Sequence, residues 1–147
     1  MSLSLQEISD RFEIQDLLYR YADIIDRRAV EELFGVFTAD AHIDYSAFGG
    51  SVGDVGETMA FLRKALPAFS NTQHLNANIQ LWIDGDNARG RVMCFNPMVM
   101  PTGEEDAVFM LGLWYADEYR RESDGWRISR RVEEKSWVFN APEFMAL

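Results

Sequence analysis

The hydrophobic side chains at the start of the chain recur at helical spacing. From Leu5 to Ile25 the apolar residues stand three or four positions apart, as on one face of a helix. Just ahead of this run, Ser4 and Glu7 have the spacing of a capping box at a helix N-terminus. The pattern predicts one long helix over residues 5–27.

Shorter elements follow the long helix. Asp54 and Glu57 repeat the capping-box spacing, and Pro67 ends the helical pattern that begins there. A glycine-rich stretch ahead of Asp54 indicates a loop. The expected elements are a helical segment at residues 30–37, a brief strand at 41–45 and a helix at 58–66.

The hydrophobic period changes to two in the second half of the chain. Turn-forming residues separate four alternating segments, so an antiparallel meander is expected. Helices followed by such a meander predict an α+β fold in which a strongly curved antiparallel sheet wraps around the helices and encloses a cavity. The four strands are expected at residues 73–83, 88–100, 107–122 and 125–139.

Composition narrows the classes of protein. The 147 residues, 48% of them hydrophobic, show no linker or repeat, so we expect a single domain over residues 1–147. A net charge of −10 argues against nucleic acid as a partner. One cysteine and two histidines exclude an intrachain disulfide and a Cys/His zinc cluster, so we expect neither a metal nor a cofactor.

The same composition bears on localisation. The chain begins without a basic segment followed by an apolar one, as a signal peptide would have. Its longest apolar run, residues 107–116, is about half of the ~20 residues that a membrane helix needs. We therefore expect a cytoplasmic protein with no membrane partner.

Two aspartates near the end of the long helix differ in their position around its axis. Asp23 falls on the charged face, four residues before Arg27. Asp26 lies one turn after Ala22 and two turns after Leu18, on the apolar stripe that faces the core. A carboxylate there needs a partner, so Asp26 is either a cap at the helix end or a functional group.

His74 is open to two interpretations. On its strand it shares a face with Asn76, and the alternating Leu75 and Ala77 begin the other, apolar face. In one interpretation, the strand face is half-exposed and the imidazole lies in water. In the other, the face lines a polar pocket. If the sheet curls over the first helix, His74 meets Asp26, and a carboxylate on one ring nitrogen leaves the other as a general base.

Other polar side chains are candidates of lower weight. Tyr45 alternates with His42 and is expected to point inward, where its hydroxyl can meet a substrate oxygen, whereas His42 faces solvent. Of the arginines in the last strand, one is expected to turn inward. Large apolar side chains of the later strands are core residues first, and some of them are candidates to line a cavity.

The chain resembles the SnoaL-like polyketide cyclase and dehydratase superfamily in three segments: YADIIDRR (residues 21–28), HIDYSAF (42–48) and TQHLNANIQL (72–81). The likeness is nearest to scytalone dehydratase and hexachlorocyclohexane dehydrochlorinase. It implies a cystatin-like α+β cone whose Asp–His dyad corresponds to Asp26 and His74. It also implies that Arg131, in WRISRR, and Tyr45, in the IDY motif, belong to the site.

The chain departs from both enzymes. Ile25 replaces the tyrosine that precedes the aspartate in scytalone dehydratase, whose second histidine falls near Val92 or Met93. Tyr21 replaces the lysine on the first helix of the dehydrochlorinase. Neither specific activity is therefore implied. The resemblance and the residue pattern together give the expected substrate-binding residues: Tyr21, Ile25, Phe48, Asn76, Phe95, Phe109 and Trp137.

These observations lead to a hypothesis and an alternative. The hypothesis is a cofactor-independent lyase or isomerase in which His74, oriented by Asp26, removes a proton from a small hydrophobic, cyclic or carbonyl-bearing substrate, and Arg131 or Tyr45 stabilises the developing charge. The alternative is a non-catalytic binding or assembly module of the same fold. In both, apolar strand faces predict a homo-oligomer, and the resemblance implies a trimer or a dimer. The tail from Phe139 onward is expected to seal the mouth of the pocket of its own or a neighbouring subunit.

Overall fold

The computed structural model describes residues 2–145, and its first element is the long helix that the sequence predicts. Helix α1 (Leu5–Arg27) begins at a capping box, in which the Ser4 hydroxyl accepts a hydrogen bond from the Glu7 backbone N–H at 3.1 Å. The Glu7 carboxylate accepts one from the Ser4 backbone N–H in return. The helix ends at Arg28, in the left-handed region with φ 63°. A capping box therefore marks the start of the helix, and a left-handed residue marks its end.

The connecting elements differ in detail from the expectation. The predicted segment at residues 30–37 is a 3₁₀ helix, η1 (Val30–Gly35), and the strand after it is longer than predicted, β1 (Phe37–Asp44). The Asp54 capping box places the start of the next helix three residues earlier than predicted. The remaining elements before the meander are η2 (Ser46–Phe48), β2 (Val52–Gly53), α2 (Val55–Ala65), η3 (Leu66–Ala68) and β3 (Asn71–Thr72).

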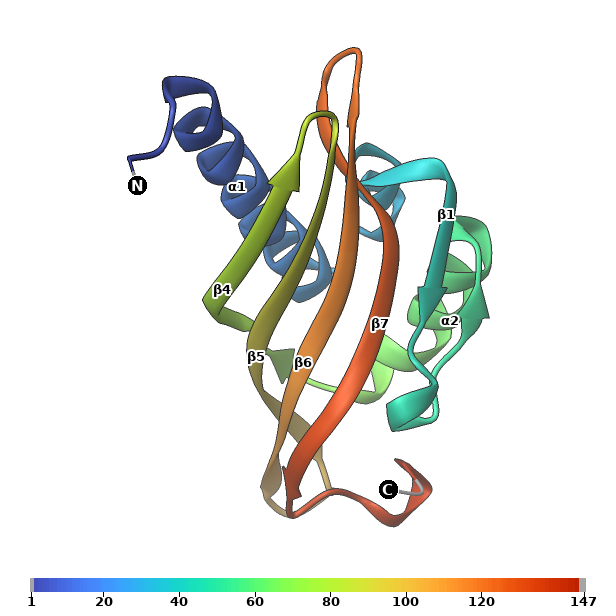
Figure 1. Ribbon diagram of the computed structural model, residues 1–147. Coiled ribbons are helices and arrows are strands. Elements are labelled where there is room, and N and C mark those ends of the chain that lie inside the picture. The colour runs from blue at the N-terminus through green and yellow to red at the C-terminus, as the bar shows by residue number, and fades with distance from the viewer. Residues whose placement is uncertain (1, 146–147) are drawn as a thin grey trace.

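The meander consists of β4 (Leu75–Asp84), β5 (Asn87–Pro101), β6 (Asp106–Glu122) and β7 (Gly125–Phe139), and a short 3₁₀ turn, η4 (Glu143–Met145), follows it. The strands bend around α1, which lies across one face of the sheet (Figure 1). The sheet order is β2-β1-β7-β6-β5-β3, and β4 also pairs with β5. The α+β architecture is thus confirmed.

The expectation of a purely antiparallel sheet was wrong at one edge. β1 pairs with β7 in parallel, and His42 lies opposite Arg130 in the register. The meander strands are joined by tight turns, which require antiparallel neighbours. β1 arrives from the helices instead, so no turn dictates its direction when it adds to the free edge of β7.

Strict alternation along β4 was also wrong. The register shifts between Ala77 and Gln80, and Asn78 takes a positive φ of 46°. An extra residue of this kind reverses the side-chain alternation beyond it. Leu75 is therefore on the outer face, 47% exposed, whereas three apolar residues after the shift pack against the core: Ile79, Leu81 and Ile83.

The hydrophobic core fills the space between α1 and the concave face of the sheet. Helix α1 contributes a stripe that includes Ile14, Leu18 and Ile24, each with no exposed surface. From the sheet, Phe109 and Ile128 are equally buried. Among the helices of residues 2–145, none combines the length and the apolar character that crossing a membrane requires.

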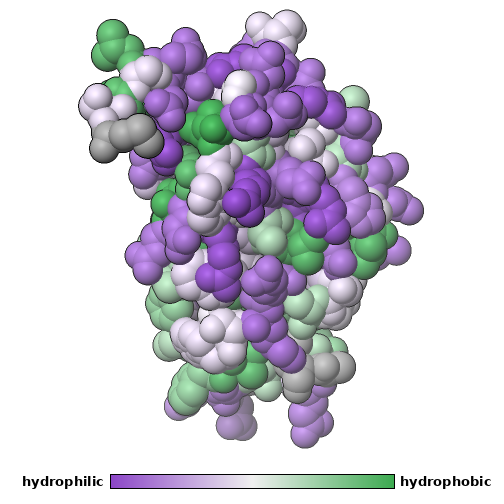
Figure 2. Space-filling view, viewed as in Figure 1, coloured by the Kyte–Doolittle hydropathy of each residue, from purple (hydrophilic) through white to green (hydrophobic). Residues whose placement is uncertain are grey.

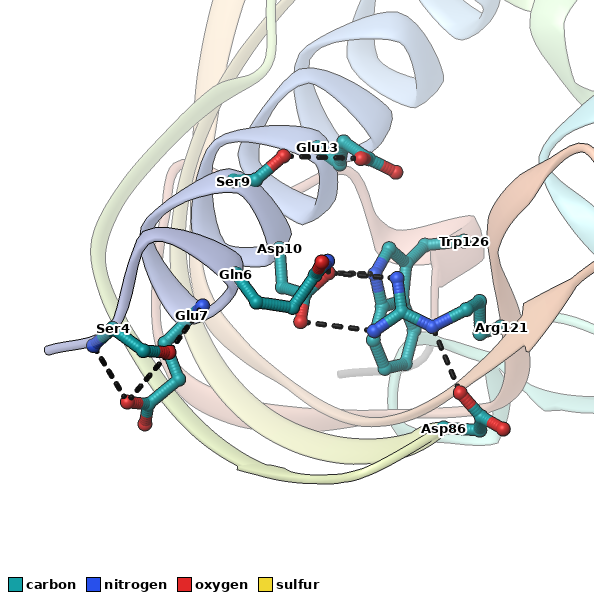
Figure 3. A network of polar contacts seen from close by, with 9 residues as sticks. All are labelled: Ser4, Gln6, Glu7, Ser9, Asp10, Glu13, Asp86, Arg121 and Trp126. Atoms are coloured by element: carbon teal, nitrogen blue, oxygen red, sulfur yellow. Dashed lines mark hydrogen bonds and ion pairs between the residues drawn. The ribbon is translucent and has the colours of Figure 1, made fainter.

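A buried carboxylate fixes the N-terminal half of α1 to the end of the sheet. Asp10, 2% exposed, accepts hydrogen bonds from Arg121 at 2.7 and 2.9 Å and from the Trp126 indole N–H at 3.1 Å (Figure 3). Arg121 also bonds Asp86 in the β4–β5 turn at 2.9 Å. The bonds from Arg121 are the main cause that lowers the pKa of Asp10 to about 2. The helix, the β4–β5 turn and the β6–β7 hairpin therefore meet at one charged cluster.

Asp10→Asn removes this charge, so we expect it to lower the free energy of unfolding by about 2 kcal/mol at neutral pH. A carboxyl whose pKa is depressed by folding stabilises the protein above its unfolded pKa, and that contribution is lost as pH falls toward about 2. Urea unfolding at several pH values measures the difference. The exposed Asp16 on the same helix gives the control, Asp16→Asn. A deficit that stays constant down to pH 2 would contradict the role of the charge.

Candidate active site

A cavity of about 550 Å³ lies between the end of α1, helix α2 and the concave face of the sheet. Most of its wall is apolar, and a few polar groups converge on it, as in sites for small organic molecules. The polar groups come from α1, the segment after β1, α2, the β3–β4 segment, β5, β6 and β7. They are the side chains of Tyr21, Tyr45, Lys64, His74, Asn96, Tyr115 and Glu133.

Asp26 and His74 meet at this cavity. The His74 Nδ1 lies 2.6 Å from Asp26 Oδ1, and the Asp26 carboxylate also accepts hydrogen bonds from the His74 backbone N–H at 2.9 Å and the Thr72 hydroxyl at 3.0 Å. The side chain of His74 is 10% exposed and that of Asp26 is 24% exposed. Burial raises the pKa of Asp26, but the bonds from His74 and Thr72 outweigh it and hold that pKa below its usual range. Asp26 is therefore a carboxylate at neutral pH.

His74 lies in the short connection between two strands and not in a strand. It lies between β3 and β4, just ahead of Leu75, because β4 begins two residues later than predicted. Asn96, 4% exposed, donates from Nδ2 to the Gln73 carbonyl at 2.9 Å and so fixes the backbone beside His74. The sequence analysis missed Asn96, although an asparagine among apolar neighbours in a buried strand indicates a buried hydrogen bond.

Two tyrosine hydroxyls form a second polar point on the cavity wall. The hydroxyls of Tyr21, on α1, and Tyr45, after β1, lie 2.5 Å apart. Burial raises the pKa of Tyr21 to about 12 and that of Tyr45 well above its ordinary value. Both hydroxyls are therefore protonated at neutral pH, and one hydrogen of the pair is available to a bound oxygen.

Arg131 is the arginine that turns inward, but it lies behind the cavity wall. It has no exposed surface and forms two bonds to Asp117, at 2.8 and 2.6 Å. Its guanidinium carbon is 4.2 Å from the ring centre of Tyr21 and 3.8 Å from that of Tyr115. The rings separate Arg131 from the cavity, so its charge acts on the site through them.

The predicted substrate-binding residues divide into two groups. Tyr21, Ile25 and Phe48 line the cavity, whereas the other four do not. Asn76 donates to the Leu18 carbonyl, and Phe109 is buried against Phe69. Phe95 and Trp137 lie on the outer face of the sheet, 37% and 45% exposed, where their rings pack together.

The outward position of these two aromatic rings has a structural reason. Phe95 lies opposite Gly112, and so does Trp137 from the other side. A side chain at Gly112 would collide with the Trp137 indole, so the glycine opens the space that this ring covers. A register shift between Gly112 and Leu113 reverses the alternation of β7, so Trp137 faces outward although Glu133 on the same strand lines the cavity. The other residues of these strands that line the cavity are Asn96, Met98, Leu111, Leu113 and Tyr115.

The C-terminal segment lies at the cavity as expected. Phe144 and Met145 are among the residues that line it. Leu147, which we expected to join them, lies outside the described residues. Within residues 2–145, no three side chains of His, Cys, Asp or Glu come together in a way that would hold a metal ion.

Helices packed in the concavity of a curled sheet, with a polar dyad at an apolar cavity, define an α+β cone of the NTF2-like kind. The family described as a SnoaL-like domain matches residues 6–132. The uncharacterized protein Rv2910c of Mycobacterium tuberculosis is 48% identical over 133 residues, which cover 90% of each chain. The chain therefore belongs to the SnoaL-like domain family, and the predicted resemblance is confirmed.

Solved structures support the same fold. Kfla4162 from Kribbella flavida superposes with a TM-score of 0.86 at 28% identity, and the match covers 96% of this chain and 99% of that one. A type 2 hexachlorocyclohexane dehydrochlorinase, LinA, superposes with a TM-score of 0.81 at 19% identity, covering 94% of this chain and 93% of that one. At this level of identity, the likeness to the dehydrochlorinase concerns the fold.

Asp26→Asn tests the dyad through stability. The amide keeps the size of the side chain but places donors against the donors of His74 and Thr72, so we expect a loss of about 1–3 kcal/mol at neutral pH. Because folding depresses the pKa of Asp26, the loss shrinks as pH falls through that depressed value. Chemical unfolding across pH measures it.

Asp23→Asn is the control, because Asp23 pairs with Arg27 in an exposed position on the same helix. We expect this control to change stability by less than about 1 kcal/mol. Equal effects of the two substitutions would show that the buried contacts of Asp26 add nothing to the free energy of unfolding.

Proposed function

We propose that the protein is a cofactor-independent lyase or isomerase in which His74 removes a proton from carbon. The observation that carries the proposal is the short contact of His74 Nδ1 with the Asp26 carboxylate at an apolar cavity. A buried histidine with one nitrogen held by a carboxylate is the arrangement that a general base requires. The name of the dehydrochlorinase LinA describes an elimination, which agrees with a reaction of this class.

The tautomer of His74 follows from its partner. Because Asp26 is ionised, its carboxylate accepts a hydrogen bond from a protonated Nδ1. The neutral ring therefore keeps its lone pair on Nε2. As the base takes up a proton, the carboxylate stabilises the imidazolium that forms. Asp26 is thus a positioning residue, and His74 is the residue that touches the substrate.

The tyrosine pair supplies the opposing electrophile. Removing a proton beside a carbonyl places negative charge on its oxygen, and the hydrogen that the Tyr21–Tyr45 hydroxyl pair leaves free can be donated to that oxygen. The guanidinium of Arg131, which is paired with Asp117, lies behind the Tyr21 ring. In this proposal Tyr45 contacts the substrate, and Arg131 acts electrostatically without touching it.

The cavity indicates the kind of substrate. Its wall combines aromatic and aliphatic side chains such as Phe69, Met98 and Leu113 with few polar groups. A volume of about 550 Å³ suits a small hydrophobic molecule. We infer a cyclic or carbonyl-bearing compound whose acidic C–H lies near His74 and whose oxygen lies near the tyrosines.

His74→Asn tests the proposed base. With cyclic ketones such as 1-tetralone and 2-tetralone in deuterated buffer, we expect the wild-type protein to exchange the hydrogens beside the carbonyl. We expect the variant to lose roughly 10²–10⁴-fold of this rate. Proton NMR of the ketone measures the exchange, and circular dichroism checks that the variant is folded.

His42→Asn is the matched control, because His42 is the chain's other histidine and is exposed on β1. This variant should exchange the ketone hydrogens at the wild-type rate. Wild-type exchange that survives in His74→Asn would assign proton transfer to another group. Absence of exchange in the wild-type protein would favour a binding module.

We also propose that the protein forms a closed oligomer, a dimer or a trimer. The outer face of the sheet carries half-exposed apolar side chains that a second subunit would cover, and in Figure 2 hydrophobic side chains lie among hydrophilic ones. Single exposed residues are normal, but these belong to neighbouring strands. They are Leu75, Trp82, Phe95, Val108 and Trp137.

Light scattering at micromolar concentration tests this assembly. A mass two or three times the 16.9 kDa of one chain is expected. Replacing Trp137 and Phe95 together by serine should shift the protein toward the monomer without changing ketone exchange, because both rings lie outside the cavity. A stable wild-type monomer would contradict the proposal.

A further inference from the structure

The amide of Asn96 reaches the cavity with one of its two ends already engaged. Asn96 lies on β5, is 4% exposed and lines the same cavity as His74. Its Nδ2 donates a hydrogen bond to the Gln73 carbonyl at 2.9 Å. A carbonyl oxygen accepts hydrogen bonds and donates none, so this bond fixes which end of the amide is the nitrogen. The amide oxygen, Oδ1, therefore occupies the other end.

The Oδ1 atom of Asn96 is left without a protein donor. Within residues 2–145, both polar contacts of this side chain are made by Nδ2, with the Gln73 carbonyl and with His74 Nδ1. An amide oxygen taken out of water without a donor is costly, and most buried ones are paired. On the wall of a cavity, a free acceptor of this kind is a place for a donor group of a bound molecule.

The surroundings of Asn96 on the wall are apolar. Leu111 lies opposite it on β6, and Met98 lies two residues further along β5 on the same face. Both line the cavity and have no strong acceptor for a hydroxyl group. A ligand donor in this part of the cavity is therefore directed to the Asn96 oxygen.

A second asparagine shows that position, and not residue type, distinguishes Asn96. Asn76 on the neighbouring strand β4 donates from Nδ2 to the Leu18 carbonyl at 3.1 Å, and its Oδ1 is also buried without a partner. Asn76 is not among the residues that line the cavity. It makes the same kind of bond as Asn96 but away from the site, so it is a matched control.

Asn96 is also a direct neighbour of the proposed base. Its Nδ2 lies 3.5 Å from His74 Nδ1, and the two nitrogens of an imidazole are bonded to one shared carbon. A substrate whose C–H meets His74 Nε2 therefore places the groups on that carbon next to the Asn96 amide. The tyrosine pair, which is to receive the carbonyl oxygen, forms a separate polar point of the wall.

We propose that Asn96 is a specificity-determining residue whose Oδ1 accepts a hydrogen bond from a hydroxyl of the substrate. The substrate class is an α-hydroxy ketone, with the hydroxyl on the carbon that loses its proton. This inference rests on the proposed function, because the position of His74 as base defines which carbon that is. It narrows the substrate from any cyclic or carbonyl-bearing compound to one with a donor at a defined place.

Asn96 takes no part in the transfer of protons. The C–H bond breaks, its proton goes to His74 Nε2, and the electron pair forms the C=C bond of an enolate whose negative charge lies on the carbonyl oxygen. The hydroxyl keeps its hydrogen and its C–O bond throughout. When His74 has exchanged its proton with solvent, it returns one to the carbon.

Two ketones of nearly the same shape test the assignment. They are 2-hydroxy-1-tetralone and 2-methyl-1-tetralone, each with a single hydrogen on the carbon beside the carbonyl. Proton NMR in deuterated buffer measures the exchange of this hydrogen with the protein and with free imidazole. Dividing the first rate by the second removes the difference in acidity between the two ketones.

We expect the wild-type protein to prefer the hydroxy ketone by roughly 10-fold or more in the normalised kcat/KM, because the methyl ketone leaves Oδ1 unpaired. Asn96→Leu, which has no amide, should lose most of this preference. It should also be slower on both ketones, because the Gln73 carbonyl loses its donor. The ratio of the two rates separates the two effects.

A second variant divides the two ends of the amide. Asn96→Asp has an acceptor but no donor, so we expect it to be slower on both ketones and to keep the preference for the hydroxy ketone. The control Asn76→Leu should also keep the preference. Circular dichroism checks that each variant is folded, and Asn96→Ser, which is too short to reach the same partners, replaces Asn96→Leu if the latter does not fold.

The outcomes distinguish this inference from the function on which it rests. Equal normalised rates of the wild-type protein on the two ketones would overturn the specificity role and leave His74 as the base. A preference that survives in Asn96→Leu or Asn96→Ser would do the same. Exchange of neither ketone by the wild-type protein would contradict the proposed function itself and the role of Asn96 with it.

Discussion

The structure depends on how the carboxylate of Asp26 is held at the end of α1. Its position on the apolar side of the helix takes a charge out of water, and only specific donors make that position tolerable. The donors come from one short segment, which carries Thr72 and His74. The same bonds therefore join the helix to the sheet, hold the connection between β3 and β4 and orient the imidazole at the cavity.

The cavity exists because the sheet is anchored to α1 at both ends of the helix. At the N-terminal end, Asp10 binds Arg121 and Trp126 of the β6–β7 hairpin. Between the two anchors, the ion pair of Asp117 with Arg131 fills the floor beneath the tyrosine rings. Buried ion pairs are poor sources of net stability but impose a definite geometry. In this protein, they separate a packed core from the space that remains open beside it.

The sequence predicted the elements and the dyad better than the details of the sheet. Capping boxes and periodicity are local signals, so α1 and the meander strands were close to their observed bounds. Asp26 stood out because it interrupts the apolar stripe of its helix, and His74 because the family resemblance pairs it with Asp26. The parallel β1–β7 pair and the shift near Asn78 depend on contacts between distant segments, which periodicity does not contain. For the same reason Glu133, one of several charged residues in the last strand, gave no local signal.

The state of the His74 ring tests the central claim most directly. The chain has two histidines, so ¹⁵N NMR of histidine-labelled protein gives two sets of ring signals, and His74→Asn identifies one of them. In the neutral ring, the account predicts a protonated Nδ1 and a bare Nε2 for His74, whereas the exposed His42 should show a mixture of tautomers. A neutral His74 that carries its proton on Nε2 would have no lone pair to offer a substrate, and that result would contradict the account.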